Sequence, residues 1–277
     1  MNRASHAPIA SRLALFGPPY ERFVPIDISW EPPPPPPRGL ALIWWLEDAD
    51  EQMEQFEWLA RRPYGMPLFV ILPPPASIER SLPLLTFINN LSPRAVLPGG
   101  PLVTPLHLRR LLRTPPRHFG SAVTSYLTRR QILLRDDIRR NVRKIFESVP
   151  EVTSITKLAR RLYTSRRTLG RHFAAAGLPV PSHWLQFGRL LMASIRLQDD
   201  RFTVARVAAR LGYPDGFTLS NQMKRLLDCR PSDIRHHLGW EWVVEMWLKT
   251  ETGNGGIDRV RYSEAISIYC SDDEVLA

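Results

Sequence analysis

The chain has 277 residues, of which 44% are hydrophobic and 23% are charged, so it is neither disordered nor fibrous and is long enough for about two domains. The net charge of +10 comes from one region. Residues 1–134 hold 14 Lys and Arg against 10 Asp and Glu (+4), and residues 240–277 hold 3 against 8 (−5). Residues 135–239 hold 20 against 9 (+11). The middle region therefore favours binding to a polyanion such as nucleic acid.

We expect no secretory signal in the first residues of the chain. Residues 1–10 lack the apolar region of a signal peptide, and no stretch reaches the roughly 18 consecutive apolar residues of a membrane span. We therefore expect a cytoplasmic protein with no membrane partner. Cys229 and Cys270 are too few for a disulfide framework and lack the spacing of a zinc site, so we expect reduced thiols.

The first part of the chain alternates between strand and helix patterns. Short apolar runs suited to buried strands occur at 40–46, 67–72 and 94–97, and residues 12–16 and 23–28 can add one or two strands. Helical spacing follows these runs at 51–62, 77–91 and 105–112. We interpret the prolines at 32–37 as a stiff spacer rather than a ligand for a proline-binding domain. The order predicts an α/β domain with a parallel sheet covered by helices.

Residues 10–115 resemble a reduced receiver domain of the two-component type. A receiver needs acidic residues around Mg²⁺, an aspartate that accepts phosphate, and a lysine after the last strand. No early acidic pair is visible here, and Leu97, Pro98 and Gly99 stand where the lysine belongs. We therefore interpret the acidic residues after the central strand as helix caps and keep phosphorylation at two of them as the alternative. They are Glu47 and the two candidate acceptors, Asp48 and Asp50.

Residues 1–120 are accordingly predicted to be a receiver-like regulatory or dimerisation domain. We expect it to act in signal reception or self-association without phosphorylation. Its aromatic side chains favour a homodimer, because such a surface packs well against a second copy. They include Trp44, Trp45, Phe56 and Trp58.

A linker helix is predicted at 121–134, and residues 154–176 then have the pattern of a helix, a tight turn and a second helix. Ser165 is placed to cap the second helix by accepting a hydrogen bond from a backbone amide. At 100° per residue, Leu169 and Phe173 share the buried side of that helix. The opposite face combines basic and small residues, which suits the major groove. It holds Arg167, Gly170, Arg171 and Ala174.

The same plan recurs about forty residues later. Residues 204–211 predict an amphipathic helix, Gly212 permits the turn, and residues 217–227 predict the second reading helix. Leu219 and Met223 form its buried pair. The outward side chains are Phe217, Thr218, Ser220, Asn221, Lys224 and Arg225. Residues 182–197 have the length and apolar spacing of one helix that links the two units.

These motifs resemble the AraC/XylS family of transcription regulators over residues 135–239. The resemblance rests on three groups of residues: Ala159, Ser165, Arg167, Thr168, Leu169, Arg171 and Phe173; Arg189, Ala193 and Leu197; and Val207, Ala208, Leu211, Gly212, Tyr213, Pro231, Ser232 and Arg235. It implies an all-α C-terminal domain with two helix-turn-helix units joined by a linking helix. The implied function is sequence-specific binding of double-stranded DNA, without enzyme activity, cofactor or metal, and RNA polymerase becomes a candidate partner.

The resemblance also implies which residues read the bases. In the first unit they are Arg167, Gly170 and Arg171, and in the second they are Gly216, Thr218 and Asn221. Phe217 occupies a place that is usually small or polar, so we expect the second unit to use shape or thymine-methyl contacts more than hydrogen bonds. Cations beside these readers are predicted to contact phosphate. They are Arg166, Lys224 and Arg225.

Other functions stay open at this point. A phosphorylation-controlled response regulator and a non-specific architectural DNA-binding protein are both compatible with the charge pattern. Some family members carry an amidase-like N-terminal domain with a nucleophilic cysteine, but both cysteines lie beyond residue 228. Residues 240–277 are acidic and interrupted by glycines, and we expect an extension that is mobile or folded back on a neighbour.

Overall fold

The computed structural model describes residues 13–31, 37–46, 53–73, 88–100, 103–149 and 151–263. The chain forms two compact units, Met1–Leu111 and Leu112–Ala277. Several sequence predictions lie outside the described residues: the proline run at 32–36, the acidic residues Glu47, Asp48 and Asp50, most of the helix at 77–91, and Cys270. Among the described residues, no helix combines the length and apolar character that a membrane span requires.

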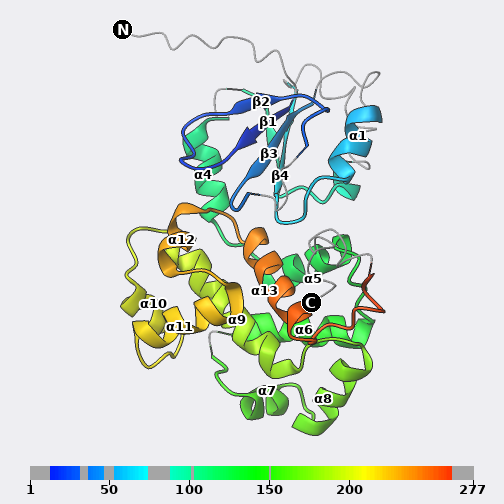
Figure 1. Ribbon diagram of the computed structural model, residues 1–277, viewed down its shortest axis with the longest axis vertical. Helices are drawn as coiled ribbons and strands as arrows, with labels where there is room; N and C mark the ends of the chain where they lie inside the picture. Colours follow the sequence, from blue (N-terminus) through cyan, green and yellow to red (C-terminus); the bar gives the residue numbers. More distant parts are fainter. Residues whose placement is uncertain are drawn as a thin grey trace. The chain divides into compact units, whose positions relative to one another are not determined.

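The first unit is built on a five-stranded sheet with the strand order β2-β1-β3-β4-β5 (Figure 1). The strands are β1 (Leu13–Phe16), β2 (Val24–Ile26), β3 (Ala41–Trp45), β4 (Leu68–Leu72) and β5 (Ala95–Pro98). The predicted parallel pairing is confirmed for β3, β4 and β5. In contrast, β1 pairs antiparallel with β2 and with β3. Residues 17–23, which connect β1 to β2, are too few for the crossover that a parallel pair requires. The sheet is therefore mixed.

Among the described residues of this unit, two helices accompany the sheet. α1 (Met53–Ala60) connects β3 to β4, and α4 (Pro105–Arg113) follows β5. Trp44 and Phe56 are buried and pack edge to face, with ring centroids 5.0 Å apart. Trp45 and Trp58 are half-buried and contact Phe23 and Trp30. The expectation that these aromatic residues form a surface for a second copy is wrong for Trp44 and Phe56, because both side chains are buried in the core between the sheet and α1.

The second unit is all-α, as predicted. It begins with α5 (Phe119–Arg129) and α6 (Asp136–Ser148), followed by α7 (Ile155–Arg161), α8 (Arg166–Ala175) and α9 (Pro181–Leu197). Then come α10 (Val204–Arg210), α11 (Gly216–Leu227), α12 (Pro231–His236) and α13 (Glu241–Gly253). The predicted linker helix at 121–134 ends early at Arg129, and Gln131 turns the chain with a φ of 61°. α5 is packed in the common core, where Val123 and Leu127 are fully buried.

α9 joins the two helix-turn-helix pairs. In Figure 1, α7 and α8 lie at one end of α9, and α10 and α11 lie at the other. Arg189 of α9 donates hydrogen bonds to the carbonyl oxygens of Leu211 (2.8 Å) and Gly212 (3.0 Å). Its guanidinium also lies 4.2 Å from the ring centroid of Tyr213. These contacts fix the turn before α11 to the linking helix.

α13 lies in the stretch that the acidic composition set apart as an extension. The structure differs, because Trp247 is fully buried and stacks on Phe187 of α9, with ring centroids 4.1 Å apart and planes 3° from parallel. The buried Glu245 carboxylate accepts hydrogen bonds from the Tyr126 hydroxyl (2.7 Å) and the Arg130 Nε (3.0 Å). Acidic residues in this helix therefore serve internal pairing rather than solvation.

Candidate nucleic-acid interface

The second helix of the first unit, α8, is fixed at its start and along one side. The Ser165 Oγ accepts a hydrogen bond from the Thr168 backbone N–H at 3.0 Å, which confirms the predicted cap. Leu169 and Phe173 are 1% and 0% exposed, so the predicted buried pair is also confirmed. A capped and packed helix presents its remaining face to solvent in a defined orientation.

That remaining face of α8 is basic and has no internal counter-charge. The side chains of Arg166, Arg167 and Arg171 are exposed, and none makes a hydrogen bond or ion pair with another described residue. α8 contains no acidic residue. Some other arginines of the unit do have a local counter-charge, as in the Arg161–Glu151 and Arg201–Asp199 pairs. The face is thus free to bind an external anion.

Gly170 lies between these arginines. A Cβ built at this position would meet nothing within 4 Å, so no packing within the unit requires glycine here. The missing side chain leaves the backbone of α8 open in the middle of the basic face. A helix with such a gap can approach a groove of a nucleic acid closely.

In the second unit, α11 is positioned in the same way. The Asp215 Oδ1 accepts a hydrogen bond from the Thr218 backbone N–H at 2.7 Å, and this bond holds the pKa of the Asp215 carboxyl below its usual range. Leu219 and Met223 are fully buried, as predicted. Gly216 is half-buried, and a Cβ there would lie 3.3 Å from Val204 Cγ1 of α10. Gly216 therefore serves the close approach of α10 and α11.

The outward face of α11 changes character along the helix. Its first turns are uncharged, with Phe217 74% exposed, Asn221 exposed and Thr218 half-buried. Its last turn carries the cations, where Arg225 is exposed and the Lys224 Nζ pairs with the carboxylate of Asp228. A shallow cleft of about 450 Å³ runs beside this face. Its lining includes Arg189, Tyr213, Phe217, Asn221 and Arg225.

The C-terminal end of α8 is held by a segment that is distant in sequence. Three consecutive carbonyl oxygens, those of Ala175, Ala176 and Gly177, accept hydrogen bonds at this end. The donors are the Arg261 Nη1 (3.1 Å), the Tyr262 hydroxyl (2.9 Å) and the Asp258 backbone N–H (3.0 Å). Sequence reasoning missed this contact, because no local pattern links residues 86 positions apart.

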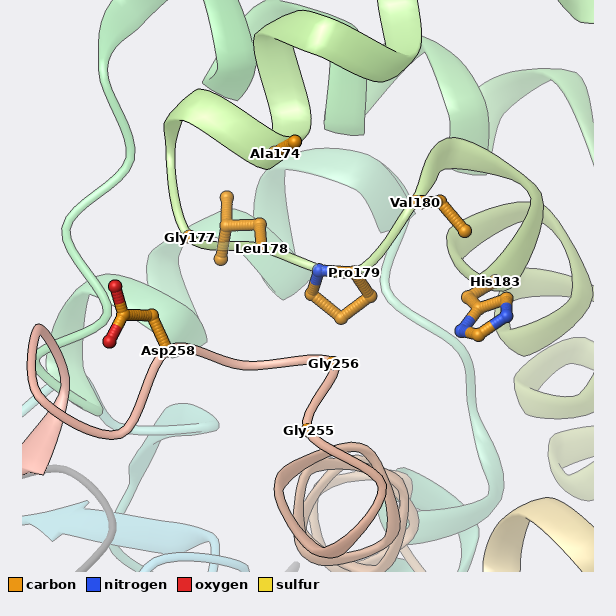
Figure 2. A pocket seen from close by; sticks show the side chains of 9 residues that line it. All are labelled: Ala174, Gly177, Leu178, Pro179, Val180, His183, Gly255, Gly256 and Asp258. Atoms are coloured by element: carbon orange, nitrogen blue, oxygen red, sulfur yellow. The ribbon is translucent and has the colours of Figure 1, made fainter.

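A cleft of about 480 Å³ lies along the same junction, between the α8–α9 turn and residues 255–258 (Figure 2). Its wall at Leu178, Pro179 and Val180 is apolar. At one end, the His183 Nδ1 lies 3.1 Å from an oxygen of the buried Glu251, which joins α9 to α13. His183 thus connects α9 with α13. No group of three potential metal ligands occurs among the residues that the structure describes.

Comparison with known proteins agrees with this geometry. A family model described as a helix-turn-helix domain matches residues 158–237. The regulatory protein SoxS of Escherichia coli K12 is 29% identical over 94 residues, which cover 34% of this chain and 88% of that protein, and SoxS of Salmonella typhimurium LT2 matches equally.

Among solved structures, the transcriptional regulator CdpR from Pseudomonas aeruginosa aligns with 20% identity and a TM-score of 0.32. The alignment covers 55% of this chain and spans half the length of CdpR. The family match contains most of α7 and all of α8, α9, α10 and α11, which are the two helix pairs and their linking helix. The family match, together with the similarity to SoxS, assigns a helix-turn-helix domain of the AraC type to residues 158–237.

Proposed function

We propose that this protein is a sequence-specific transcription regulator that places α8 and α11 in successive major grooves of double-stranded DNA. The observation that carries the proposal is the outward face of α8, where Arg166, Arg167 and Arg171 are exposed and without partners among the described residues. Such a face on a capped, packed helix fits the negatively charged groove. We propose a regulatory role for this interface.

Within this proposal, some side chains contact base edges and others contact phosphate. Arg167 and Arg171 reach base edges, with Gly170 allowing the backbone to come close, while Arg166 contacts phosphate. In the second unit Phe217, Thr218 and Asn221 face the bases, and Gly216 contributes through its packing against α10. Lys224 and Arg225 contact phosphate, because they lie in the last turn of α11.

The test is a double replacement on α8. Arg167→Ala with Arg171→Ala should weaken binding to a selected site by about 1–3 kcal/mol per lost base contact and relax the preference at neighbouring base pairs. Arg22→Ala with Arg61→Ala is the control, since it removes two exposed arginines from the N-terminal unit. Equal losses on selected and random DNA in the α8 variant would show that these arginines contact only phosphate.

A non-specific architectural protein is the competing candidate, because the +11 charge of residues 135–239 alone gives affinity for any duplex. The two candidates differ in the ratio of affinities. A sequence-specific regulator should bind its selected site about 10³-fold or more tightly than random DNA at the same salt concentration. A ratio near one would favour the architectural function.

For the N-terminal unit we propose signal reception or self-association as a homodimer, without phosphorylation. The end of β5 has Leu97, Pro98 and Gly99 in place of a receiver lysine, and Leu106 of α4 exposes 76% of its surface. An exposed leucine of this kind suits a contact between copies. RNA polymerase is a further proposed partner, contacted by the regulator when it is bound at a promoter.

Sedimentation of the full chain with and without acetyl phosphate tests this part. Dimerisation should not depend on acetyl phosphate, and Leu106→Glu should weaken it. A chain that dimerises only after phosphate is transferred to Asp48 or Asp50 would support the response-regulator alternative instead.

A further inference from the structure

We infer that the DNA site of this protein is unequal in base composition: α8 binds a guanine-containing segment, and α11 binds an A·T-rich segment about one helical turn away. The inference rests on the proposed function and adds the chemistry of its ligand. It follows from the different side chains that the two helices expose in their first turns.

The base-facing part of α8 offers hydrogen-bond donors without side-chain acceptors. Arg167 and Arg171 carry guanidinium groups, which donate up to five hydrogen bonds and accept none. In the major groove, guanine is the base that presents two acceptors side by side, O6 and N7, whereas adenine pairs one acceptor with the N6 donor. α8 has no carboxylate or amide side chain to accept from adenine or cytosine. Its exposed chemistry therefore selects guanine.

The corresponding part of α11 is uncharged. Asn221 carries an amide that both donates and accepts, which matches N7 and N6 of adenine. Phe217 precedes it by one turn, and its ring is 74% exposed. An aromatic ring in water gains free energy when it covers another apolar group, and the apolar group in the major groove is the thymine C5 methyl. Asn221 and Phe217 together select A·T pairs.

The cations near α11 are placed where they do not change this selection. Arg225 and Lys224 follow in the last turn, beyond the base-facing residues. Arg189 lines the neighbouring cleft, but its guanidinium is engaged by the carbonyl oxygens of Leu211 and Gly212. No described arginine or lysine lies between Gly216 and Met223 in α11 to compete for guanine.

The distance between the two segments follows from α9. This helix has 17 residues, and it contacts both helix-turn-helix pairs. It is therefore about 25 Å long. Two helices joined by a linking helix of this length, here α8 and α11, fit adjacent major-groove faces, whose centres are about 34 Å or 10 base pairs apart. The guanine and A·T segments should have this fixed separation.

Selection from a random duplex library with the full chain is the first test. The enriched sequences should contain a guanine-containing and an A·T-rich segment about 10 base pairs apart. Arg167→Ala should relax only the guanine segment. Phe217→Ala and Asn221→Ala should relax only the A·T segment. Thermal unfolding of each variant separates a local loss of contacts from a loss of fold.

Base analogues in the selected site supply the second test. Replacing thymine by uracil removes the C5 methyl and should weaken the wild type about fourfold per methyl that Phe217 covers. Replacing guanine by 7-deazaguanine removes the N7 acceptor and should cost about tenfold. Phe217→Ala should abolish the first effect and retain the second, and Arg167→Ala should do the reverse.

The outcomes separate the inference from the function on which it rests. If the library yields no enriched sequence, the proposed sequence-specific function fails. If it yields a specific site whose two segments have the same composition, or if uracil costs the wild type nothing, the function stands and the inference is overturned. A bipartite site with both analogue effects in the predicted variants supports it.

Discussion

Tyr213 carries a buried hydroxyl for which no hydrogen-bond partner occurs in the described part of the chain. The ring of Tyr213, by contrast, makes a stabilising contact, because the Arg189 guanidinium stacks over it. Tyr213→Phe keeps the ring and removes the hydroxyl, so the free energy of unfolding should stay unchanged or rise by up to about 1 kcal/mol. Tyr213→Leu, which removes the ring, should lower it by about 1 kcal/mol or more. Denaturant unfolding measures both, and a clear loss in Tyr213→Phe would contradict the prediction.

The same side chain predicts how stability depends on pH. Burial raises the pKa of Tyr213 to about 12. An unfolded tyrosine has a pKa near 10, so the folded state favours the neutral phenol. The contribution of the neutral Tyr213 phenol to the free energy of unfolding is therefore complete below about pH 10 and is lost as the pH rises towards about 12. Unfolding measured at about pH 9 and 11 should show a smaller loss in Tyr213→Phe than in the wild type. Identical losses would contradict the burial effect.

Lys224 and Asp228 form an exposed pair at the end of α11, where Asp228 has a φ of 44°. Asp228→Asn should strengthen binding to every duplex, because it removes a negative charge near phosphate and releases Lys224 from its ion pair. Asparagine tolerates the backbone conformation of Asp228, so the fold should be kept.

Lys224→Ala should weaken binding to all sequences about equally and flatten the slope of log K against log salt by about one. Titrations at several salt concentrations test both, and unchanged slopes would refute the phosphate role of Lys224.

Among the elements, the C-terminal end of α8 depends on residues 258–262. The Tyr262 hydroxyl is a buried donor to the Ala176 carbonyl oxygen, so Tyr262→Phe leaves that oxygen unpaired. We expect amides in the last turn of α8 to exchange about fivefold faster, as loss of roughly 1 kcal/mol implies. Val260→Ala is the control, because Val260 lies in the same segment and is 91% exposed. Equal exchange in both variants would show that the bond does not hold α8.

The elements that local chemistry determines could be predicted from the sequence. α8 and α11 follow from apolar spacing around Leu169 and Leu219, and the Ser165 cap follows from the side chain that precedes the helix. α13 could not be predicted in the same way. Its Glu245 pairs with Arg130, 115 residues away, so an acidic pattern that is typical of a solvated tail belongs to a core helix. The Arg261 and Tyr262 contacts were missed for the same reason.

For the whole molecule, the packing of α5 and α13 defines what must be kept for the DNA-binding unit to fold. Residues 112–263 include both helices, whereas residues 135–239 lack Tyr126, Trp240 and Trp247. We expect the longer fragment to unfold cooperatively and the shorter one to lose a fixed tertiary structure, since removing one buried tryptophan side chain alone costs about 3–5 kcal/mol. Near-ultraviolet circular dichroism during thermal unfolding distinguishes them. A cooperative transition in the shorter fragment would contradict the shared core.

The bonds from residues 258–262 to α8 also set an order of events during synthesis. The chain reaches Ala176 while Tyr262 is still 86 residues from being added. At about 5–20 residues per second, the ribosome needs roughly 4–17 s to make that stretch. During this interval the nascent α8 has its cap at Ser165 but not the groups that hold its other end. The basic reading helix is thus completed only after the linking helix and the second helix-turn-helix unit have been translated.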